Sequence, residues 1–361
     1  MHVEIVVPDL FWPDRTTRDG DRTTRDAYNN LPLPTIEKIL ARGRRSTGEG
    51  SGIDNWLMRY APHAPTLAPT LAALRRAGED RSINESQSGG HWLCADPCHL
   101  QVSRDTLQLT EAAQLTLSDS EAEAIVATLN QHFAQDQLQL EIGAAARWYL
   151  NIAQPFHFTA VAPYQARHAP LESSLPSGPD GARWRSWLNE VQMLLHQHPV
   201  NQARDARGIT PINSVWLWGT DNAAADDTGP ALRRAPARWV AGLPLARGIA
   251  RSTRVPLLSL PIDASRLTPS DGVSIVVIDS LQDAVARRDL DAWRAALAVL
   301  ERDWFAPLGA MLANGVIGMI TVVALTTEGW LSVETTRADL RFFWRRPRSL
   351  GSYVASHVAS S

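Results

Sequence analysis

The polar side chains best suited to chemistry gather between residues 187 and 219. They comprise two histidines, two amides, two guanidinium groups and a hydroxyl, in the order His196, His198, Asn201, Arg204, Arg207, Asn213 and Ser214. Arg204 and Arg207 are three residues apart, so both can point to the same side of a helix. Guanidinium forks and amides suit a phosphate or a carboxylate. The segment therefore predicts an anion-binding site.

Two helical segments and a strand are expected to position these groups. Four apolar residues fall at helical spacing, namely Leu188, Val191, Leu194 and Leu195. Pro199 restarts the helix where a missing N–H costs least, and Gly208 stands where that helix should end. Residues 212–218 then form an apolar strand pattern. The polar groups thus lie between two strongly patterned elements.

The same residues also have structural interpretations. One of the two histidines would cap the C-terminus of the first helix. Asn201 and Asn213 would cap helices and close turns, and the two arginines would line a solvated helix face. The tryptophans at positions 216 and 218 favour an enclosed site over a solvated one. Both interpretations stay open at this point.

A second cluster lies in the segment HWLCADPCHL. His91, Cys94, Cys98 and His99 are zinc-type ligands in number, but Cys98 and His99 are adjacent and would face opposite sides of a strand. Buried thiols are the favoured interpretation of the cysteines. Asp96 and His99 flank Pro97, where a turn between two short strands could present a carboxylate and an imidazole for acid–base work. Turn capping by Asp96 is the alternative.

The first strand of the chain ends at a carboxylate. Residues 3–7 read as a buried strand, and Pro8 and Asp9 follow directly. The central strand of an α/β sheet delivers a polar residue to its carboxyl edge in this way. Asp9 is therefore a candidate metal ligand.

Composition limits the function classes. The chain has 361 residues, is 44% hydrophobic and carries a net charge of -3, which favours a globular fold and no nucleic-acid partner. Lys38 is the sole lysine, which argues against a P-loop or Schiff-base chemistry. Two cysteines and an N-terminus without a signal-peptide pattern favour the cytoplasm. The longest apolar run, residues 315–325, predicts a buried strand and no membrane span.

Alternating strands and helices at both ends of the chain predict an α/β fold, with a mixed or parallel sheet flanked by helices. Residues 1–90 and 237–361 would form the two halves of this core, and residues 91–236 an inserted α+β subdomain. Ser118 and Glu121 predict a capping box for a helix over 118–134. A solvated loop is expected for the duplicated DRTTRD segment over 14–26 and a flexible linker around Gly48 to Gly52. A long helix is expected over 290–313 and a terminal one over 337–343.

Several motifs carry a family resemblance. HPVNQARDARGITPINSVWLWG and ADPCHLQVSRDTLQL resemble motifs of archaeal-type cofactor-independent phosphoglycerate mutases, and Arg147 resembles their arginine at the start of a strand. A bacterial group labelled RpfE-type regulatory proteins is similar over ADPxHL, HPVN, NSVWLWG and a terminal FWRRP, covering about residues 92–219 and 279–347. The resemblance implies an alkaline-phosphatase-like core.

The resemblance also implies what a catalytic member would need. Such enzymes use two divalent ions, manganese or zinc, held by Asp and His at strand ends, which activate a hydroxyl and neutralise phosphoryl charge. Asp9 matches the first aspartate by position. The glycine and histidine expected after Asp279 are missing, and Thr326-Thr327-Glu328-Gly329 replaces the late Asp-His-Gly. After Gly219 the chain contains one histidine, His357.

Three functions follow as hypotheses. The first is a catalytically degenerate mutase-like protein with a regulatory or ligand-binding role and without a cofactor. Its donors would bind a small phosphorylated or carboxylated metabolite, or would only hold the scaffold together; they are Arg147, Asn201, Arg204, Arg207 and Asn213. The second is an active metal-dependent phosphomutase or phosphatase that uses Asp9, Asp96, His99 and His198. The third is a protein-interaction scaffold, which predicts an exposed tryptophan patch. Convergence of the candidate side chains in one cleft would support either of the first two.

Overall fold

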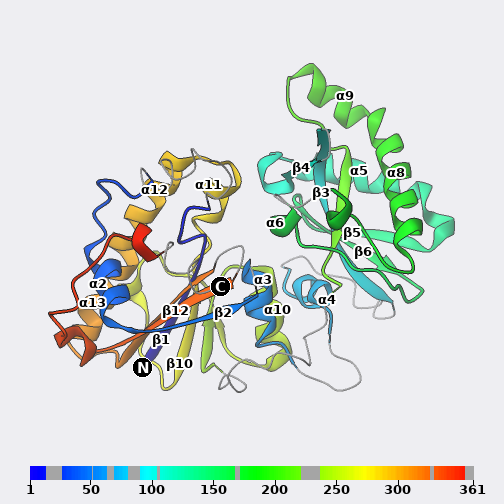
Figure 1. Cartoon of the computed structure of the whole chain (residues 1–361). Helices are drawn as coiled ribbons and strands as arrows, with labels where there is room; N and C mark the ends of the chain where they lie inside the picture. The colour runs from blue at the N-terminus through cyan, green and yellow to red at the C-terminus, as the bar shows by residue number, and fades with distance from the viewer. Residues whose placement is uncertain are drawn as a thin grey trace. The chain divides into compact units, whose positions relative to one another are not determined.

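The computed structural model describes residues 1–13, 27–50, 52–62, 69–79, 90–103, 106–166, 171–220, 236–325 and 329–353. The chain divides into two compact units (Figure 1). Unit 1 comprises Met1–Tyr60, Asp227–Ala246 and Ala250–Ser361, and unit 2 comprises Ala61–Asp226 and Arg247–Ile249. The second unit is therefore an insertion in the sequence of the first. The duplicated DRTTRD segment lies outside the described residues.

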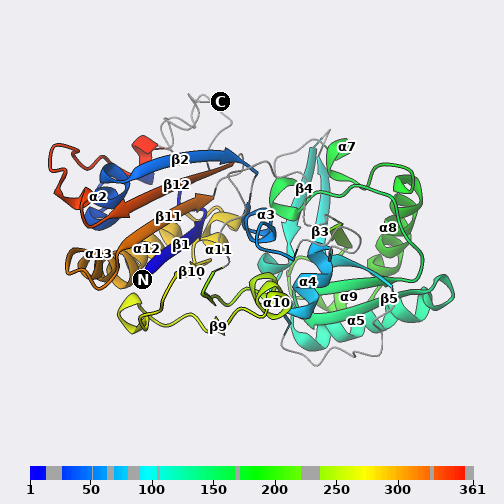
Figure 2. The same cartoon turned by 90° about the horizontal axis from the view of Figure 1, so that it is seen from below.

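Unit 1 contains a mixed seven-stranded sheet in its described residues, ordered β2-β12-β11-β1-β10-β8-β9 (Figure 2). Five strands are parallel: β1 (His2–Pro8), β8 (Arg238–Val240), β9 (Leu257–Leu258), β10 (Val273–Val277) and β11 (Met319–Leu325). β12 (Gly329–Thr336) and β2 (Arg44–Glu49) add to one edge in antiparallel orientation. The fold class expected from the sequence is confirmed.

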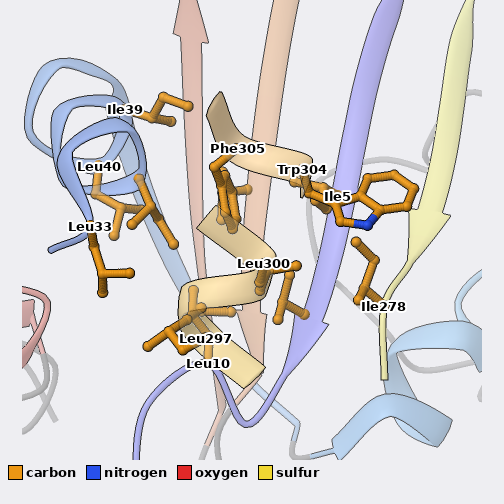
Figure 3. Close-up of a cluster of buried hydrophobic side chains, with 14 of the residues drawn as sticks. Ile5, Leu10, Leu33, Ile39, Leu40, Ile278, Leu297, Leu300, Trp304 and Phe305 are labelled. Carbon is orange, nitrogen blue, oxygen red and sulfur yellow. The ribbon is translucent and has the colours of Figure 1, made fainter. Parts of the chain in front are cut away.

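Helices cover both faces of this sheet. One face of β1 carries apolar side chains, and the other carries a mixture of polar and apolar ones. Val3, Ile5 and Val7 enter the main core with α2 (Pro34–Arg42), α12 (Leu290–Leu300) and α13 (Ala306–Ala313). Figure 3 shows Ile39 and Leu40 of α2 grouped with Leu300, Phe305 and Ile5. On the other face, Tyr60, just after α3 (Gly52–Met58), donates to Glu4 at 3.0 Å. The remaining helices of unit 1 are α10 (Pro244–Thr253), which extends into the short second part of unit 2, and α11 (Gln282–Ala286).

The long helix expected over 290–313 is continuous but changes its winding in the middle. A π-helical turn, Glu301–Phe305, separates α12 from α13. The buried carboxylate of Glu301 accepts hydrogen bonds from the backbone amides of Thr35 and Ile36 at 2.8 and 3.0 Å. A carboxylate at these free amides stabilises the first turn of α2. The π-helical turn thus begins at Glu301, the residue whose side chain caps the N-terminus of α2.

Unit 2 pairs an antiparallel sheet with helices. The sheet order is β4-β3-β6-β5, and β7 also pairs with β3. Its strands are β3 (His91–Ser103), β4 (Thr106–Glu111), β5 (Leu138–Ala144), β6 (Arg147–Ile152) and β7 (Ser214–Trp218). Its longer helices are α4 (Leu71–Ala77), α5 (Asp119–His132), α8 (Gly181–His196) and α9 (Pro199–Ala206), and α6 (Pro163–Ala166) and α7 (Leu171–Ser174) are single turns. The core joins sheet residues such as Trp148 and Leu150 to Ile125 of α5 and Val191 of α8.

Three local expectations were wrong. The proposed linker at Gly48 is strand β2, where the ring of Trp330 lies so close that a Cβ on Gly48 would come within 2.3 Å of it. The two short strands around Pro97 are one strand, β3, because β7 pairs with it continuously from Cys94 to Cys98. The terminal helix over 337–343 is a single 3-10 turn, Asp339–Arg341. The first division between the compact units follows Tyr60, and α4 packs on β3.

The described helices are too short or too polar to cross a bilayer.

Candidate functional site

The carboxyl edge of the unit 1 sheet carries Asp9 directly after β1, as the sequence predicts. Its backbone has a positive φ of 55°, and its amide donates to Leu325 O at 3.3 Å. Its carbonyl accepts from Trp293 Nε1 at 2.9 Å. Aspartate adopts left-handed backbone more readily than most residues, which suits this turn at the end of a buried strand. The neighbours on both sides hold the turn in place.

Asp279 lies at the end of the adjacent parallel strand. The Ile278 amide donates to Val6 O at 3.0 Å, which aligns the last residues of β10 with those of β1. Burial raises the pKa of Asp279, and a hydrogen bond from its own backbone amide lowers it only in part. Desolvation favours the neutral acid over the carboxylate. Asp9 and Asp279 are thus neighbouring acids with different surroundings.

The described residues at this edge do not by themselves form a two-metal centre. Among the described residues, no three or more His, Cys, Asp or Glu side chains are grouped so that they could hold an ion. His2 lies at the opposite end of β1, where its Nε2 contacts Thr321 Oγ1 at 2.7 Å. His357 and the segment 326–328, which the resemblance places at a ligand position, lie outside the described residues. Burial raises the pKa of Asp279, and a carboxylate must lose its proton to bind a metal ion, so the burial of this side chain opposes metal binding.

In unit 2, the two arginines predicted to bind an anion share one protein carboxylate. Arg204 donates to Glu121 Oε2 at 3.2 Å, and Arg207 to Glu121 Oε1 at 2.9 Å. Arg204 is 1% exposed and also donates to the carbonyls of Thr210, at 2.9 Å, and Leu115. Glu121 closes the predicted capping box with Ser118 at the start of α5. An external anion would have to displace Glu121 from both guanidinium groups.

The two asparagines also have protein partners. Asn201, 3% exposed, donates to the carbonyls of Leu195 and Ile212 and accepts from the Ile212 amide, all within 2.8 Å. Asn213 accepts from the Leu100 amide at 2.7 Å and donates to the Leu100 carbonyl at 2.8 Å, which continues the pairing of β7 with β3. Each asparagine side chain thus makes hydrogen bonds to backbone groups at a point where a regular helix or strand ends. The structural interpretation of these residues describes the observed contacts.

The candidate histidines lie in separate surroundings. His99 Nδ1 donates to Pro211 O at 3.0 Å. His198 Nδ1 accepts from the Val200 amide at 3.2 Å, and its Nε2 contacts Thr128 Oγ1 at 3.0 Å. Burial lowers the pKa of His198, which keeps the ring neutral and able to accept. A cap at the C-terminus of α8 was expected from one histidine, but His198 instead caps the N-terminus of α9.

A buried charge network joins α4 to the sheet of unit 2. Asp96, 8% exposed, accepts from Arg75 Nη1 at 3.0 Å, Trp218 Nε1 at 2.9 Å and the Trp148 amide at 3.2 Å. Asp96 therefore lies within a strand, and the turn expected to present it is absent from the described residues 90–103. β3 changes partner from β6 to β4 around this position, so the carboxylate accepts the Trp148 amide that the strand leaves unpaired.

Glu79 forms the second half of the network. It accepts from Arg147 Nε at 2.8 Å, Arg147 Nη2 at 2.9 Å and Tyr149 Oη at 2.6 Å. Burial acts to raise the pKa of Glu79, but the hydrogen bonds from Arg147 and Tyr149 and the charges of Arg147 and Arg75 lower it overall. Arg75 and Glu79 were not identified from the sequence. The available signal was Asp96 itself, because a carboxylate buried in a strand requires a cation nearby.

The cysteines next to this network are buried thiols. Cys94 is 0% and Cys98 1% exposed, and both are free. Burial, followed by the charges of Asp96 and Glu111, raises the pKa of Cys98 well above its ordinary value. A thiol held protonated is a poor nucleophile and a poor metal ligand.

The candidates within unit 2 are therefore not brought together. Asp96 contacts Arg75, His99 contacts Pro211, and His198 contacts Thr128. In the part of the chain that the structure describes, none of these three side chains hydrogen bonds to another. Asp9 belongs to unit 1. Each of the three side chains in unit 2 instead contacts a different partner within the unit.

Comparison with known proteins gives a consistent set of relatives at low identity. No family model matches the chain. The 2,3-bisphosphoglycerate-independent phosphoglycerate mutase of Methanosarcina mazei is 25% identical over 215 residues, which are 55% of this chain and 50% of the relative. That of Methanosarcina acetivorans is 23% identical over 276 residues, 73% of this chain and 66% of the relative. The matches thus span about half to two thirds of these relatives.

A solved structure gives a similar result. The cofactor-independent phosphoglycerate mutase from Thermoplasma acidophilum aligns over 97% of this chain and 94% of its own, with a TM-score of 0.45 and 17% identity. The sequence matches show that the chain is similar, at low identity, to 2,3-bisphosphoglycerate-independent phosphoglycerate mutases.

Proposed function

We propose that the chain is a phosphoglycerate-mutase-like protein with a ligand-binding or regulatory role and without phosphoryl-transfer activity. The observation that carries this proposal is the sheet edge of unit 1. There the strand ends β1 and β10 present Asp9 and Asp279, and burial raises the pKa of Asp279. Phosphoryl transfer by a pair of metals requires ionised carboxylates and further ligands to fix both ions. Among the described residues, no group of three or more His, Cys, Asp or Glu side chains accompanies this acid pair.

The donors of unit 2 are part of the same proposal. Arg147 binds Glu79, and Arg204 and Arg207 bind Glu121, at distances of 2.8 to 3.2 Å. A charged group already paired with a carboxylate has little capacity left for a weak external anion. We infer that these arginines hold the subdomain together, and that Asn201 and Asn213 do the same through backbone groups.

The test is an activity and binding assay on the full chain. Conversion of 3-phosphoglycerate is measured without metal and with Mn²⁺ or Zn²⁺, beside calorimetric titration of each ion. We expect no turnover above the blank under any condition. Metal-dependent turnover that Asp9→Asn abolishes, but that Asp271→Asn at an exposed loop position leaves intact, would overturn the proposal.

Titration of metal-free protein with 3-phosphoglycerate tests the ligand. Binding that Arg207→Gln leaves unchanged supports a site outside the predicted anion cluster. Binding that Arg207→Gln abolishes would instead restore the anion site predicted from the sequence, because Arg207 is 55% exposed and its loss should not disturb the fold.

An active metal-dependent phosphomutase or phosphatase is the second candidate. It is favoured by the named activity of the Methanosarcina acetivorans relative, whose match covers 73% of this chain. In that case the metal would need ligands in addition to Asp9, and the sequence offers Asp96, His99 and His198 as candidates. The Mn²⁺ titration distinguishes the two candidates.

A further inference from the structure

An exposed cluster of aromatic and basic side chains follows the last helical turn of unit 1. It consists of Arg341, Phe342, Phe343, Trp344, Arg345, Arg346 and Arg348, hereafter the aromatic–arginine patch. Phe343 is 77% and Trp344 63% exposed. The other twelve of the 13 tryptophans are all buried, so Trp344 is an exception in this chain. Large apolar side chains exposed together mark an interaction surface.

The rings form one ordered group. The ring centroids of Trp344 lie 5.1 Å from Phe342 and 5.3 Å from Phe343. The guanidinium of Arg345 stacks on Phe342 at 4.9 Å and donates to Arg42 O at 2.8 Å. Arg42 in turn donates to Leu340 O, so the patch is anchored to the end of α2. In Figure 2 this segment lies beside α2.

The patch is strongly basic although the chain is not. Residues 337–348 contain five arginines and one aspartate, whereas the whole chain has a net charge of -3. The aspartate, Asp339, accepts from the amide and hydroxyl of Thr336 at 2.8 and 2.6 Å. Glu334 nearby is paired with Arg44. None of Arg341, Arg346 and Arg348 forms an ion pair with a carboxylate in the described part of the chain.

We propose that the aromatic–arginine patch docks on an anionic membrane surface. Aromatic rings favour the interface between water and hydrocarbon, and clustered arginines are attracted to acidic headgroups. Arg341 precedes the rings, and Arg345, Arg346 and Arg348 follow them, so guanidinium groups stand at both ends of the apolar group. Each guanidinium can donate two parallel hydrogen bonds to a lipid phosphate while the rings enter the layer beneath it. Peripheral attachment requires both kinds of contact.

The shape of the patch favours a bilayer over a folded partner. Side chains that expose 77% and 63% of their surface protrude, so they do not line a groove. A protein partner would need a preformed pocket for two adjacent rings, ringed by acidic groups. A fluid interface admits protruding rings without such a pocket. The charge is also confined to one short segment, whereas nucleic-acid grooves extend along many phosphates.

Vesicle co-sedimentation of the full chain tests the proposal. The probes are phosphatidylcholine vesicles with and without about 30% phosphatidylserine. We expect binding to the acidic vesicles only, and its loss between about 0.1 and 0.5 M NaCl. Arg346→Gln with Arg348→Gln should weaken binding roughly thirtyfold, and Phe343→Ser with Trp344→Ser should abolish it.

Matched controls separate the patch from general surface effects. Arg287→Gln with Arg302→Gln removes the same charge from other exposed positions of unit 1, and Ile262→Ser removes another side chain that is 75% exposed. Both controls should bind as the wild type does, and thermal melting verifies that every variant folds. Equal binding to neutral vesicles, or wild-type binding by either patch variant, would overturn the proposal. Failure on vesicles together with binding of a single-stranded oligonucleotide or polyglutamate would overturn it and assign the patch to that partner.

Discussion

The carboxyl edge of the unit 1 sheet and the polar segment of unit 2 differ in how their polar groups are used. The segment over residues 187–219 is rich in donors, yet its arginines and asparagines bind Glu121, backbone carbonyls and Leu100. The sheet edge is marked by two acids, Asp9 and Asp279, at the ends of neighbouring parallel strands. A high density of polar residues therefore marks structure in unit 2, whereas the edge in unit 1 is recognised by the position of two acids at strand ends.

The physical reason is the need to satisfy buried polar groups. Arg204 is 1% exposed and would be costly to bury without acceptors, so its neighbours include Glu121 and two carbonyls. The edge of a parallel sheet faces no such demand, because the strands have already paired their backbone groups.

The largest effect is expected from Arg204→Ala. It removes the donors to Thr210 O, Leu115 O and Glu121 and leaves a cavity, so we expect the free energy of unfolding of unit 2 to fall by about 3 kcal/mol. Arg207→Ala removes the exposed partner of the same carboxylate and should cost less than about 0.5 kcal/mol. Urea denaturation of both variants measures the difference. Equal, small losses of stability, with loss of phosphoglycerate binding in Arg204→Ala alone, would make Arg204 a ligand donor.

A medium effect is expected from Glu79→Gln. Because the folded state lowers the pKa of Glu79 below its ordinary value of 4.5, the carboxylate stabilises unit 2 above that pH, and this stability is lost as the pH falls through the folded pKa. Near neutral pH the variant should be less stable by about 2 kcal/mol. The gap from the wild type should close in acid. Melting curves across pH measure it, with Asp136→Asn at an exposed position as the control. A gap that does not depend on pH would show that the carboxylate charge is unimportant.

The sequence predicts those parts of the fold that depend on local chemistry. The capping box of Ser118 and Glu121, Pro199 at the start of α9, Gly208 with its positive φ of 67° and Asp9 at the end of β1 follow from short-range rules, and all are found. Gly48 was misinterpreted because a glycine that makes room for a distant ring resembles a linker glycine in sequence. The single strand through Pro97 was missed because the strand that pairs across Pro97 is β7, where Val215 lies opposite Pro97 from a distant part of the sequence.

The use of each polar side chain is less predictable, because it depends on which distant element packs against it. Glu121 was recognised as a cap, but its pairing with Arg204 and Arg207 joins residues 83 and 86 positions apart. Asp96 was found as a carboxylate, but not its partner Arg75. The aromatic–arginine patch was not identified from the sequence, because the net charge of -3 is a sum over the whole chain and does not reveal a short basic segment. The search for a membrane span considered only apolar runs, and a short segment of aromatic and basic residues does not form one.

The smallest effect, from Asp279→Asn, tests the sheet edge directly. Burial raises the pKa of Asp279, so the folded state favours the protonated acid; the stabilisation is present below the unfolded pKa and is lost as the pH rises through the folded one. Asparagine carries no charge to bury, so the variant should be more stable near neutral pH, by less than about 1 kcal/mol, and equal to the wild type in acid. Asp271→Asn at an exposed position should change neither value. Thermal melting with and without Mn²⁺ measures both. If Mn²⁺ raises the melting temperature of the wild type but not of Asp279→Asn, the acid is a metal ligand kept at a cost in stability, and the sheet edge is an active centre after all.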